Sequence, residues 1–252
     1  QSGLAMALTP EGYAIPQQRG GMGDHMTGQM TAGAVCAALY ARDRTGEGQR
    51  VSVPLVRVGV YMIGWDTMLS LRLGLPTVPY DRHHAVNPII DCYRAGDGRW
   101  FWLLLLQADR HWGDLCRAAG RPDLETDERF ANIEKRRFNA PALVEEFDAV
   151  FATKPLAAWA EAFAAHNVWW APVNTIEEAI KDPVVRAAGT FVDVPGPDGD
   201  VEMVATPADF SGTPWRPQGL SPELGQHTEE VLLELGYDWE QIIPLKEHGA
   251  IP

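Results

Sequence analysis

The stretch RGGMGDHMTG at residues 19–28 constrains this chain most, because four glycines surround Asp24 and His25 immediately before a helical pattern. Glycine has no Cβ, so the backbone near Asp24 can adopt unusual dihedral angles and a ligand can approach it closely. From residue 27 to residue 43, small and apolar side chains recur at three- and four-residue spacing, which predicts a helix. The sequence therefore places a lone carboxylate beside the positive end of that helix.

Two interpretations of Asp24 follow from these residues alone. The helix dipole favours the ionised carboxylate that a nucleophile requires, and backbone amides of the nearby glycines are candidates to stabilise an oxyanion. In the alternative, Asp24 only caps the helix, and its spacing by itself favours this structural role. His25 is a candidate base or ligand donor, although a structural histidine fits that position slightly better.

The composition excludes two classes of partner. The 34 acidic residues outnumber the 21 basic ones and give a net charge of -13, whereas nucleic acids and anionic membranes require basic patches. No apolar run approaches the roughly 18 residues of a membrane-spanning helix. The three cysteines are widely spaced, as in reduced cytosolic thiols. We therefore expect a cytoplasmic protein with neither nucleic acid nor membrane as partner, while a local basic pocket for a polyphosphate-bearing small ligand stays open.

Histidines also fail to form a metal motif. His83 and His84 are adjacent, and no further ligands stand at the spacing of a zinc site. We therefore expect no metal.

The rest of the chain predicts a mixture of strands and helices. Alternating β-branched residues predict a strand at 49–56, and a second helix follows at 56–74. Three prolines without periodicity mark 75–88 as a linker. Two apolar strands around AGDG at 95–98 predict a hairpin, and a long helical region comes after it.

The C-terminal part of the chain is also predicted to contain both strands and helices. A short strand is predicted at 168–174 and a helix at 175–189. A hairpin is expected around PGPDGD at 195–200, with a trailing strand and then two short helices separated at Gly236. This order of elements predicts an α/β protein with two substructures joined near 75–88.

The stretch GMGDHMTGQMTAGAVCAALYARDRTGEGQRVSVPL resembles the central motif of the class III CoA-transferases, the family of L-carnitine dehydratase and bile-acid-inducible protein. Three later stretches are similar to the same family: NPIIDCYRAGDGRWFWLLLLQADRHWGDLCRAAGRPDL, VWWAPVNTIEEAIKDPVVRAAG and ELGQHTEEVLLELGY. The resemblance covers nearly the whole chain. It implies the class III CoA-transferase fold, with part of a Rossmann-like large domain and a smaller α+β domain, in an interlocked homodimer.

On this resemblance, residues 1–74 form the central part of the large, CoA-binding domain with its catalytic loop. Residues 75–88 form the linker, 89–190 the small domain, and 191–252 a C-terminal return toward the large domain. Family members usually carry further residues before the point where this chain starts, so we expect a fragment whose CoA site is incomplete. The glycine-rich lid of some transferases has no counterpart around residues 75–90.

The resemblance also implies a reaction. The aspartate of the family's GD motif is the catalytic carboxylate, which corresponds to Asp24. The implied activity moves CoA between an acyl-CoA thioester and a carboxylic acid through an aspartyl mixed anhydride and an aspartyl-CoA thioester. Gly21, Gly23, His25 and Gly28 are the expected contacts of the substrate and its CoA. Coenzyme A is a substrate here, and no permanently bound cofactor is expected.

Two alternatives stay open. The family contains α-methylacyl-CoA racemases, in which the matching aspartate works with a histidine from an earlier segment as an acid–base pair. His25 occupies a different position of the motif and does not replace that histidine. In the other alternative, the chain is a truncated or non-catalytic subunit, and a separate chain supplies the N-terminal half.

Overall fold

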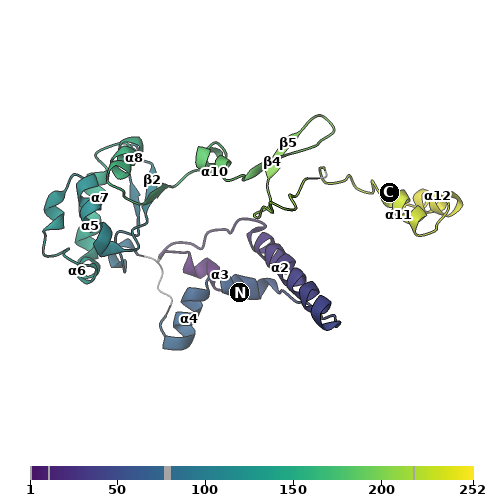
Figure 1. Ribbon diagram of the computed structural model, residues 1–252, viewed down its shortest axis with the longest axis horizontal. Helices are drawn as coiled ribbons and strands as arrows, with labels where there is room; N and C mark the ends of the chain where they lie inside the picture. The colour runs from purple at the N-terminus through teal and green to yellow at the C-terminus, as the bar shows by residue number, and fades with distance from the viewer. Residues whose placement is uncertain (1, 11, 77–80, 218) are drawn as a thin grey trace. The chain divides into compact units, whose positions relative to one another are not determined.

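The computed structural model describes residues 2–10, 12–76, 81–217 and 219–252. The chain divides into two compact units, Gln1–Val173 and Asn174–Pro252. Figure 1 follows the elements from the N-terminus in purple to the C-terminus in yellow. Within the described ranges no helix is long and apolar enough to cross a membrane.

The first unit begins with a helical region that carries the glycine-rich motif. Its helices are α1 (Leu4–Ala7), α2 (Met22–Thr45), α3 (Leu55–Met62) and α4 (Gly64–Leu73). The predicted helix is present as α2, but it starts at Met22 instead of Thr27. Gly21 makes the earlier start feasible, because it has a φ of 76°, in the left-handed region that glycine enters without strain.

The strand predicted at 49–56 is wrong, since the described residues there form no strand and α3 begins at Leu55. A strand requires a neighbouring strand that accepts and donates its ladder hydrogen bonds, and no described segment pairs with this one. The helix predicted at 56–74 is present but breaks at Ile63, which separates α3 from α4.

An antiparallel sheet organises the later part of the first unit. Its strands are β1 (Cys92–Arg94), β2 (Trp100–Leu103) and β3 (Trp170–Pro172), in the order β1-β2-β3. The AGDG turn joins β1 to β2, so the predicted hairpin is confirmed, and β3 confirms the predicted short strand. Trp102 pairs with Cys92 on one side and with Ala171 on the other.

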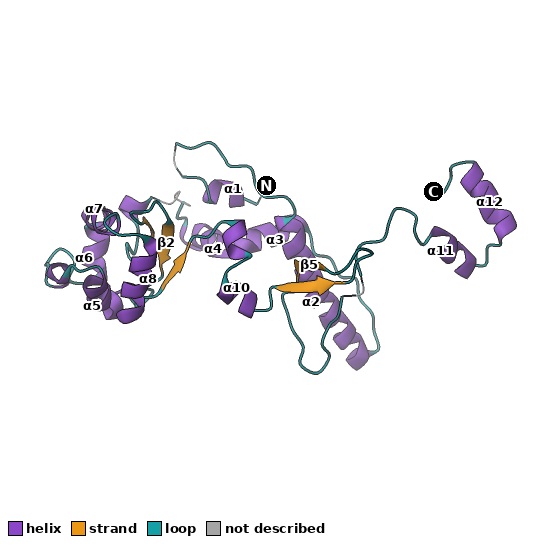
Figure 2. Ribbon diagram, turned by 90° about the horizontal axis from the view of Figure 1, so that it is seen from above, coloured by secondary structure: helices purple, strands orange, loops and turns teal. Residues whose placement is uncertain are grey.

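Helices cover one face of this sheet and bury its core (Figures 1 and 2). They are α5 (Ala108–Ala118), α7 (Ala140–Phe151) and α8 (Leu156–Ala165). Phe101 on β2 is fully buried and meets Phe151 edge to face, with ring centroids 5.1 Å apart. Trp159 also lies 5.1 Å from Phe151. The opposite face of β2 presents Trp100 and Trp102, so both sides of this strand are apolar.

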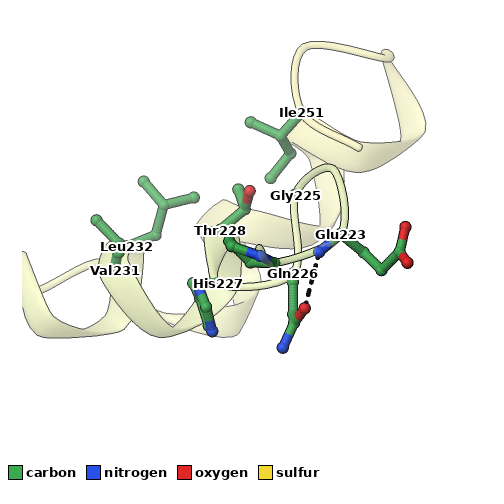
Figure 3. Close-up of a pocket in the computed structure, with 9 residues that line it drawn as sticks. Glu223, Gly225, Gln226, His227, Thr228, Val231, Leu232 and Ile251 are labelled. Atoms are coloured by element: carbon green, nitrogen blue, oxygen red, sulfur yellow. Dashed lines mark hydrogen bonds between the residues drawn. The ribbon is translucent and has the colours of Figure 1, made fainter. Parts of the chain in front are cut away.

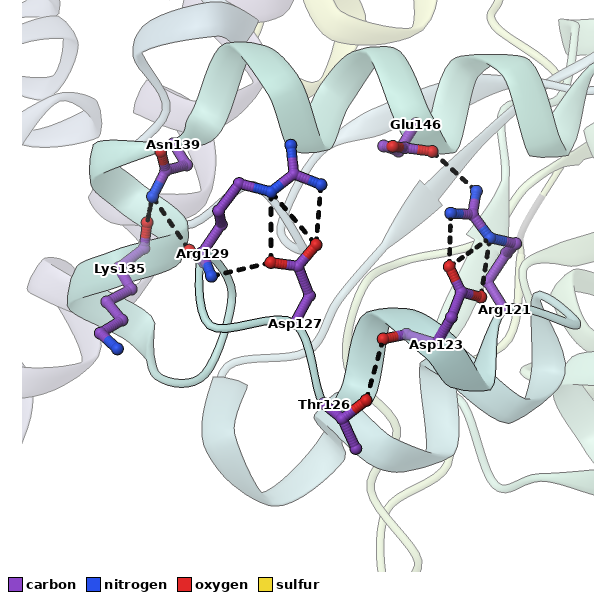
Figure 4. Close-up of polar contacts among 8 residues, drawn as sticks. All are labelled: Arg121, Asp123, Thr126, Asp127, Arg129, Lys135, Asn139 and Glu146. Atoms are coloured by element: carbon purple, nitrogen blue, oxygen red, sulfur yellow. Dashed lines mark hydrogen bonds and ion pairs between the residues drawn. The ribbon is translucent and has the colours of Figure 1, made fainter.

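Polar contacts hold the segment between α5 and α7, which contains η2 (Pro122–Glu125) and α6 (Ile133–Phe138). Arg121 forms ion pairs at 2.7 Å with Asp123 and with Glu146 of α7 (Figure 4). These two hydrogen bonds raise the pKa of Arg121 above its ordinary value. The amide of Asn139 donates to the carbonyls of Arg129 and Lys135, which fixes the corner between α6 and α7.

The predicted linker at 75–88 includes residues 77–80, which lie outside the described residues. The short helix η1 (Arg82–His84) follows them, and the side chain of Asp81 caps it by accepting the amide of His83 at 2.9 Å. The domain limits expected from the resemblance stay predictions.

The second unit contains two short helices, a hairpin and a C-terminal helix pair among its described residues. These are α9 (Ile176–Ala179), α10 (Pro183–Ala187), β4 (Phe191–Val194), β5 (Val201–Val204), α11 (Thr228–Glu234) and α12 (Trp239–Glu247). The β4–β5 hairpin and the break at Gly236 are confirmed. Asp182 caps α10 just before Pro183, which divides the helix predicted at 175–189. No described strand follows β5, so the trailing strand is wrong.

Candidate active site

Asp24 lies in the first turn of α2, three residues after the N-cap residue Gly21. The residue is exposed to solvent. In the described part of the chain its carboxylate has neither a hydrogen-bond nor an ion-pair partner. The side chain is therefore accessible to a ligand and is not tied into a structural salt bridge.

The start of α2 leaves backbone donors unpaired beside this carboxylate. The amide of His25 donates to the carbonyl of Gly21 at 2.8 Å, which closes the first turn. The amides of Met22, Gly23 and Asp24 precede that bond and so have no partner within the helix, and no side chain caps them. Free amides and the positive end of the helix dipole together favour a bound anion or a developing oxyanion.

Gly21 and His25 are brought together by the first turn. A Cβ built on Gly21 would lie 3.4 Å from Cε1 of His25, so the imidazole covers the N-cap residue. His25 follows Asp24 directly, which places the two side chains about 100° apart around the helix. His25 therefore lies beside the free amides and is not a hydrogen-bonded partner of the carboxylate.

Gly28 contributes open space, whereas a Cβ built on Gly23 would lie 4.0 Å from Cδ2 of Leu55. Gly28 is one turn beyond Asp24 and shares its face of the helix, because residues four apart are neighbours on a helix surface. Its own amide belongs to the hydrogen-bond ladder of α2, so Gly28 offers open space and no free donor. A Cβ built there would meet no atom within 4 Å.

Sequence reasoning missed the free amides of Met22 and Asp24, because it placed the start of the helix at Thr27. The signal that could have found them is Gly21, since glycine is accepted as an N-cap residue. Metal chemistry has no candidate here, because no three His, Cys, Asp or Glu side chains gather as ligands in the described ranges.

The C-terminal motif ELGQHTEEVLLELGY surrounds a separate pocket of about 430 Å³ in the second unit. Val231, Leu232 and Ile251 supply its apolar side (Figure 3). Gln226 folds back and accepts the backbone amide of Glu223 at 2.9 Å. The motif thus forms a tight turn at the start of α11, and the side chain of Gln226 makes its hydrogen bond within that turn.

Comparison with known proteins places this chain in a family. The family model described as CoA-transferase family III matches residues 1–228. The chain belongs to CoA-transferase family III, and the predicted class is confirmed.

Curated relatives of the chain include several CoA-transferases. It is 27% identical over its whole length to (R)-2-hydroxy-4-methylpentanoate CoA-transferase of Clostridioides difficile and covers 63% of that protein. It is 32% identical to succinate–glutarate CoA-transferase of Agrobacterium fabrum, over 91% of this chain and 58% of the relative. A third relative, 2-methylfumaryl-CoA isomerase of Chloroflexus aurantiacus, is also 32% identical, over 90% of this chain and 58% of the relative. The chain thus spans roughly three fifths of the length of these proteins.

Solved structures agree on the fold. A CAIB/BAIF family protein from Brucella suis is 27% identical with a TM-score of 0.74, over 92% of this chain and 60% of that structure. Rv3272 from Mycobacterium tuberculosis gives a TM-score of 0.77 at 23% identity, over 90% of this chain and 60% of that structure. The α/β class and the class III CoA-transferase fold are confirmed.

Proposed function

We propose that this chain carries the nucleophile of a CoA-transferase that moves CoA between an acyl-CoA thioester and a carboxylic acid. The observation that carries the proposal is the exposed, unpartnered carboxylate of Asp24 beside the free amides at the start of α2. The membership of CoA-transferase family III supports it. The activity belongs to the complete enzyme, because the chain spans only part of its relatives.

The first half of the reaction loads the enzyme. A carboxylate oxygen of Asp24 attacks the thioester carbonyl carbon, the C–S bond breaks, and the CoA thiolate leaves behind an acyl–aspartyl mixed anhydride. In this proposal the free amides of Met22 and Gly23 stabilise the tetrahedral oxyanion that precedes this cleavage. The thiolate then attacks the aspartyl carbonyl carbon, which releases the donor acid and leaves an aspartyl-CoA thioester.

The second half reverses these steps with the acceptor. The acceptor carboxylate attacks the aspartyl-CoA carbonyl, releases the thiolate and forms a new mixed anhydride. The thiolate attacks the acyl carbon of that anhydride, which gives the product thioester and frees the carboxylate of Asp24. Each intermediate enlarges the side chain of Asp24, so the open space beside Gly28 favours this role.

Trapping of the intermediate tests the proposal. The complete enzyme is incubated with an acyl-CoA and no acceptor, then treated with hydroxylamine or borohydride, and the modified residue is located by mass spectrometry. We expect the modification on Asp24. The Asp24→Asn variant should fold normally, as judged by circular dichroism, and should show neither modification nor transfer. Modification of another residue in the wild-type enzyme would contradict the assignment.

The second candidate function is isomerisation or racemisation of an acyl-CoA. The similarity to 2-methylfumaryl-CoA isomerase supports this candidate. In acid–base racemisation the α-proton of the acyl group is removed and returned without an acceptor acid. Exchange of that proton with deuterium from the solvent, without added carboxylic acid, would support racemisation. Transfer that requires the acceptor and leaves the α-proton in place supports the CoA-transferase.

A homodimer is the proposed assembly. Large apolar side chains on α3 and α4 are exposed, including Tyr61 at 76%, Trp65 at 77% and Leu71 at 74%. Apolar surface of this kind marks an interaction site. Light scattering after size exclusion should give twice the mass of one protein chain. A mass of one chain, with a second polypeptide retained in co-purification, would favour the subunit that relies on a partner for its N-terminal half.

A further inference from the structure

A pocket of about 640 Å³ lies in the first unit between η1 and the corner where α6 meets α7. Its lining residues are His83, His84, Glu134, Arg137, Phe138 and Pro141. None of them belongs to the candidate active site at the start of α2. We call this cavity the η1–α7 pocket.

Both walls of the η1–α7 pocket are fixed to the core of the unit. On one side, Arg82 of η1 donates to both carboxylate oxygens of Asp148 on α7, at 2.8 and 3.2 Å. On the other side, Asn139 at the junction of α6 and α7 donates from its side chain to the carbonyls of Lys135 in α6 and of Arg129 in the loop before it (Figure 4). The lining residues at this corner are therefore held by a preformed scaffold.

Phe138 and Arg137, at the corner between α6 and α7, are both accessible to a ligand. Phe138 is 87% exposed, although a phenylalanine at the end of a helix would normally bury its ring. The guanidinium of the adjacent Arg137 has no hydrogen-bond or ion-pair partner among the described residues. The neighbouring Arg136, in contrast, is fully buried and pairs with Asp109. Arg137 and Phe138 thus give the pocket lining a free guanidinium and an exposed aromatic ring.

The opposite wall of the η1–α7 pocket contains His84, whose ring is held in one orientation by Asp81. Nδ1 of His84 lies 2.6 Å from Oδ2 of Asp81, which directs the other ring nitrogen, Nε2, away from that carboxylate. The hydrogen bond from His84, followed by that from the amide of His83, lowers the pKa of Asp81. A protonated His84 would donate from both nitrogens, one to Asp81 and one to a bound anion.

We propose that the η1–α7 pocket binds a phosphate ester that carries a planar aromatic ring, which is the chemistry of a nucleotide. A guanidinium matches two phosphate oxygens at once, and an exposed phenyl ring offers a stacking surface for a base. The lining holds Arg137 and two histidines against one acid, Glu134, on a chain whose net charge is -13. A free nucleotide and the 3′-phospho-ADP part of CoA share this chemistry, and the proposal does not depend on the reaction of Asp24.

Calorimetric titration of the complete protein with fragments of the ligand shows which chemical groups the pocket recognises. The probes are adenosine 3′,5′-bisphosphate, AMP, adenosine and inorganic phosphate. We expect both nucleotides to bind more tightly than adenosine or phosphate alone. Tighter binding of the bisphosphate would assign the pocket to the nucleotide part of CoA, and equal or tighter binding of AMP would assign it to a free nucleotide. All four probes are also titrated into the Asp24→Asn variant, whose nucleotide affinities should be unchanged.

Variants of the exposed side chains locate the site. Arg137→Ala should weaken nucleotide binding about tenfold, the effect of losing one charge-assisted contact. Phe138→Ala should weaken nucleotide binding by a similar factor and leave phosphate binding unchanged. Arg110→Ala removes the same charge from the exposed surface of α5 and should bind as the wild type does. Wild-type protein that binds neither nucleotide, or affinity that Arg137→Ala and Phe138→Ala leave intact, would overturn the proposal.

Discussion

Arg82 and Asp148 form a two-pronged ion pair that joins η1 to α7, with Nη2–Oδ1 at 2.8 Å and Nη1–Oδ2 at 3.2 Å. The same guanidinium lies 3.4 Å from the fully buried carboxylate of Asp91 and 4.9 Å from the ring centre of Tyr93. One side chain therefore connects the segment before the sheet, the first strand and a covering helix.

Loss of this connection should destabilise the first unit. Arg82→Ala removes both contacts to Asp148 and withdraws a cation from the buried Asp91, so we expect a loss of about 2–3 kcal/mol in the free energy of unfolding. Urea denaturation followed by tryptophan fluorescence measures it. Arg82→Lys should retain only part of this free energy of unfolding, because an ammonium group lacks the planar fork of donors that matches a carboxylate.

The matched control for Arg82 is Arg129→Ala, which breaks an exposed ion pair with Asp127. Exposed pairs contribute little, so this variant should unfold close to the wild type. Equal unfolding curves for Arg82→Ala and Arg129→Ala would contradict the structural role of Arg82.

Gly96 in the β1–β2 turn should not tolerate a side chain. A Cβ there would lie 2.4 Å from the carbonyl oxygen of Ala152, and the amide of Gly96 donates to Lys154 at 2.8 Å. Gly96→Ala must separate the turn from the end of α7, which we expect to cost about 1–3 kcal/mol. Thermal unfolding measures the loss. Gly48→Ala, where the Cβ meets nothing within 4 Å, is the control and should leave the melting temperature nearly unchanged.

Two glycines of α2 allow an effect on helix stability to be distinguished from an effect on the candidate active site. A Cβ at Gly28 or Gly33 would meet no atom within 4 Å, so alanine at either position should stabilise the helix by about 0.5–1 kcal/mol. Gly28 shares a face with Asp24, whereas Gly33 lies nine residues away from Asp24, about 180° around the helix. In the complete enzyme, Gly28→Ala should lower CoA-transfer about tenfold or more through misplacement of the substrate, and Gly33→Ala should keep full activity. Full activity in both variants would place the substrate away from this face.

The three free cysteines should react in an order set by burial. Cys36 is exposed, Cys92 is half-buried and Cys116 is buried. Burial, with a smaller effect of Glu125, raises the pKa of Cys116 to about 12, so this thiol stays protonated at pH 8. Iodoacetamide should label Cys36 first and Cys116 only after unfolding, as peptide mass spectrometry can show. Early labelling of Cys116 in the folded protein would contradict the packing of α5.

The raised pKa of Cys116 also predicts a dependence of stability on pH. The folded protein holds this proton more tightly than the unfolded chain, in which the pKa of the thiol is near its ordinary value of 9.0. The stabilisation is complete below pH 9 and is lost as the pH rises toward 12, by about 1 kcal/mol at pH 10. Cys116→Ala should lose this part of the alkaline dependence when urea denaturation is compared at pH 8 and pH 10.

Much of the fold around the sheet follows from local patterns. The apolar run WFWL predicts a strand, and the glycines of AGDG predict its turn, because apolar character and permitted φ/ψ angles are properties of a few neighbouring residues. The same is true of α5, α7 and α8, whose apolar residues recur at helical spacing. The failure at 49–56 has a different origin, since a strand depends on a partner that the local sequence does not specify.

For the candidate site, the sequence by itself singled out Asp24 as the candidate carboxylate, because the glycine motif around Asp24 and its family pattern are both local. Only the tertiary structure decided that α2 begins at Met22, which amides stay free, and that η1 meets α7 at the pocket of Arg137 and Phe138. The physical reason is distance along the chain. Periodicity and glycine content act over a few residues, whereas the pair of Arg82 and Asp148 spans 66 positions and forms only when the chain has folded.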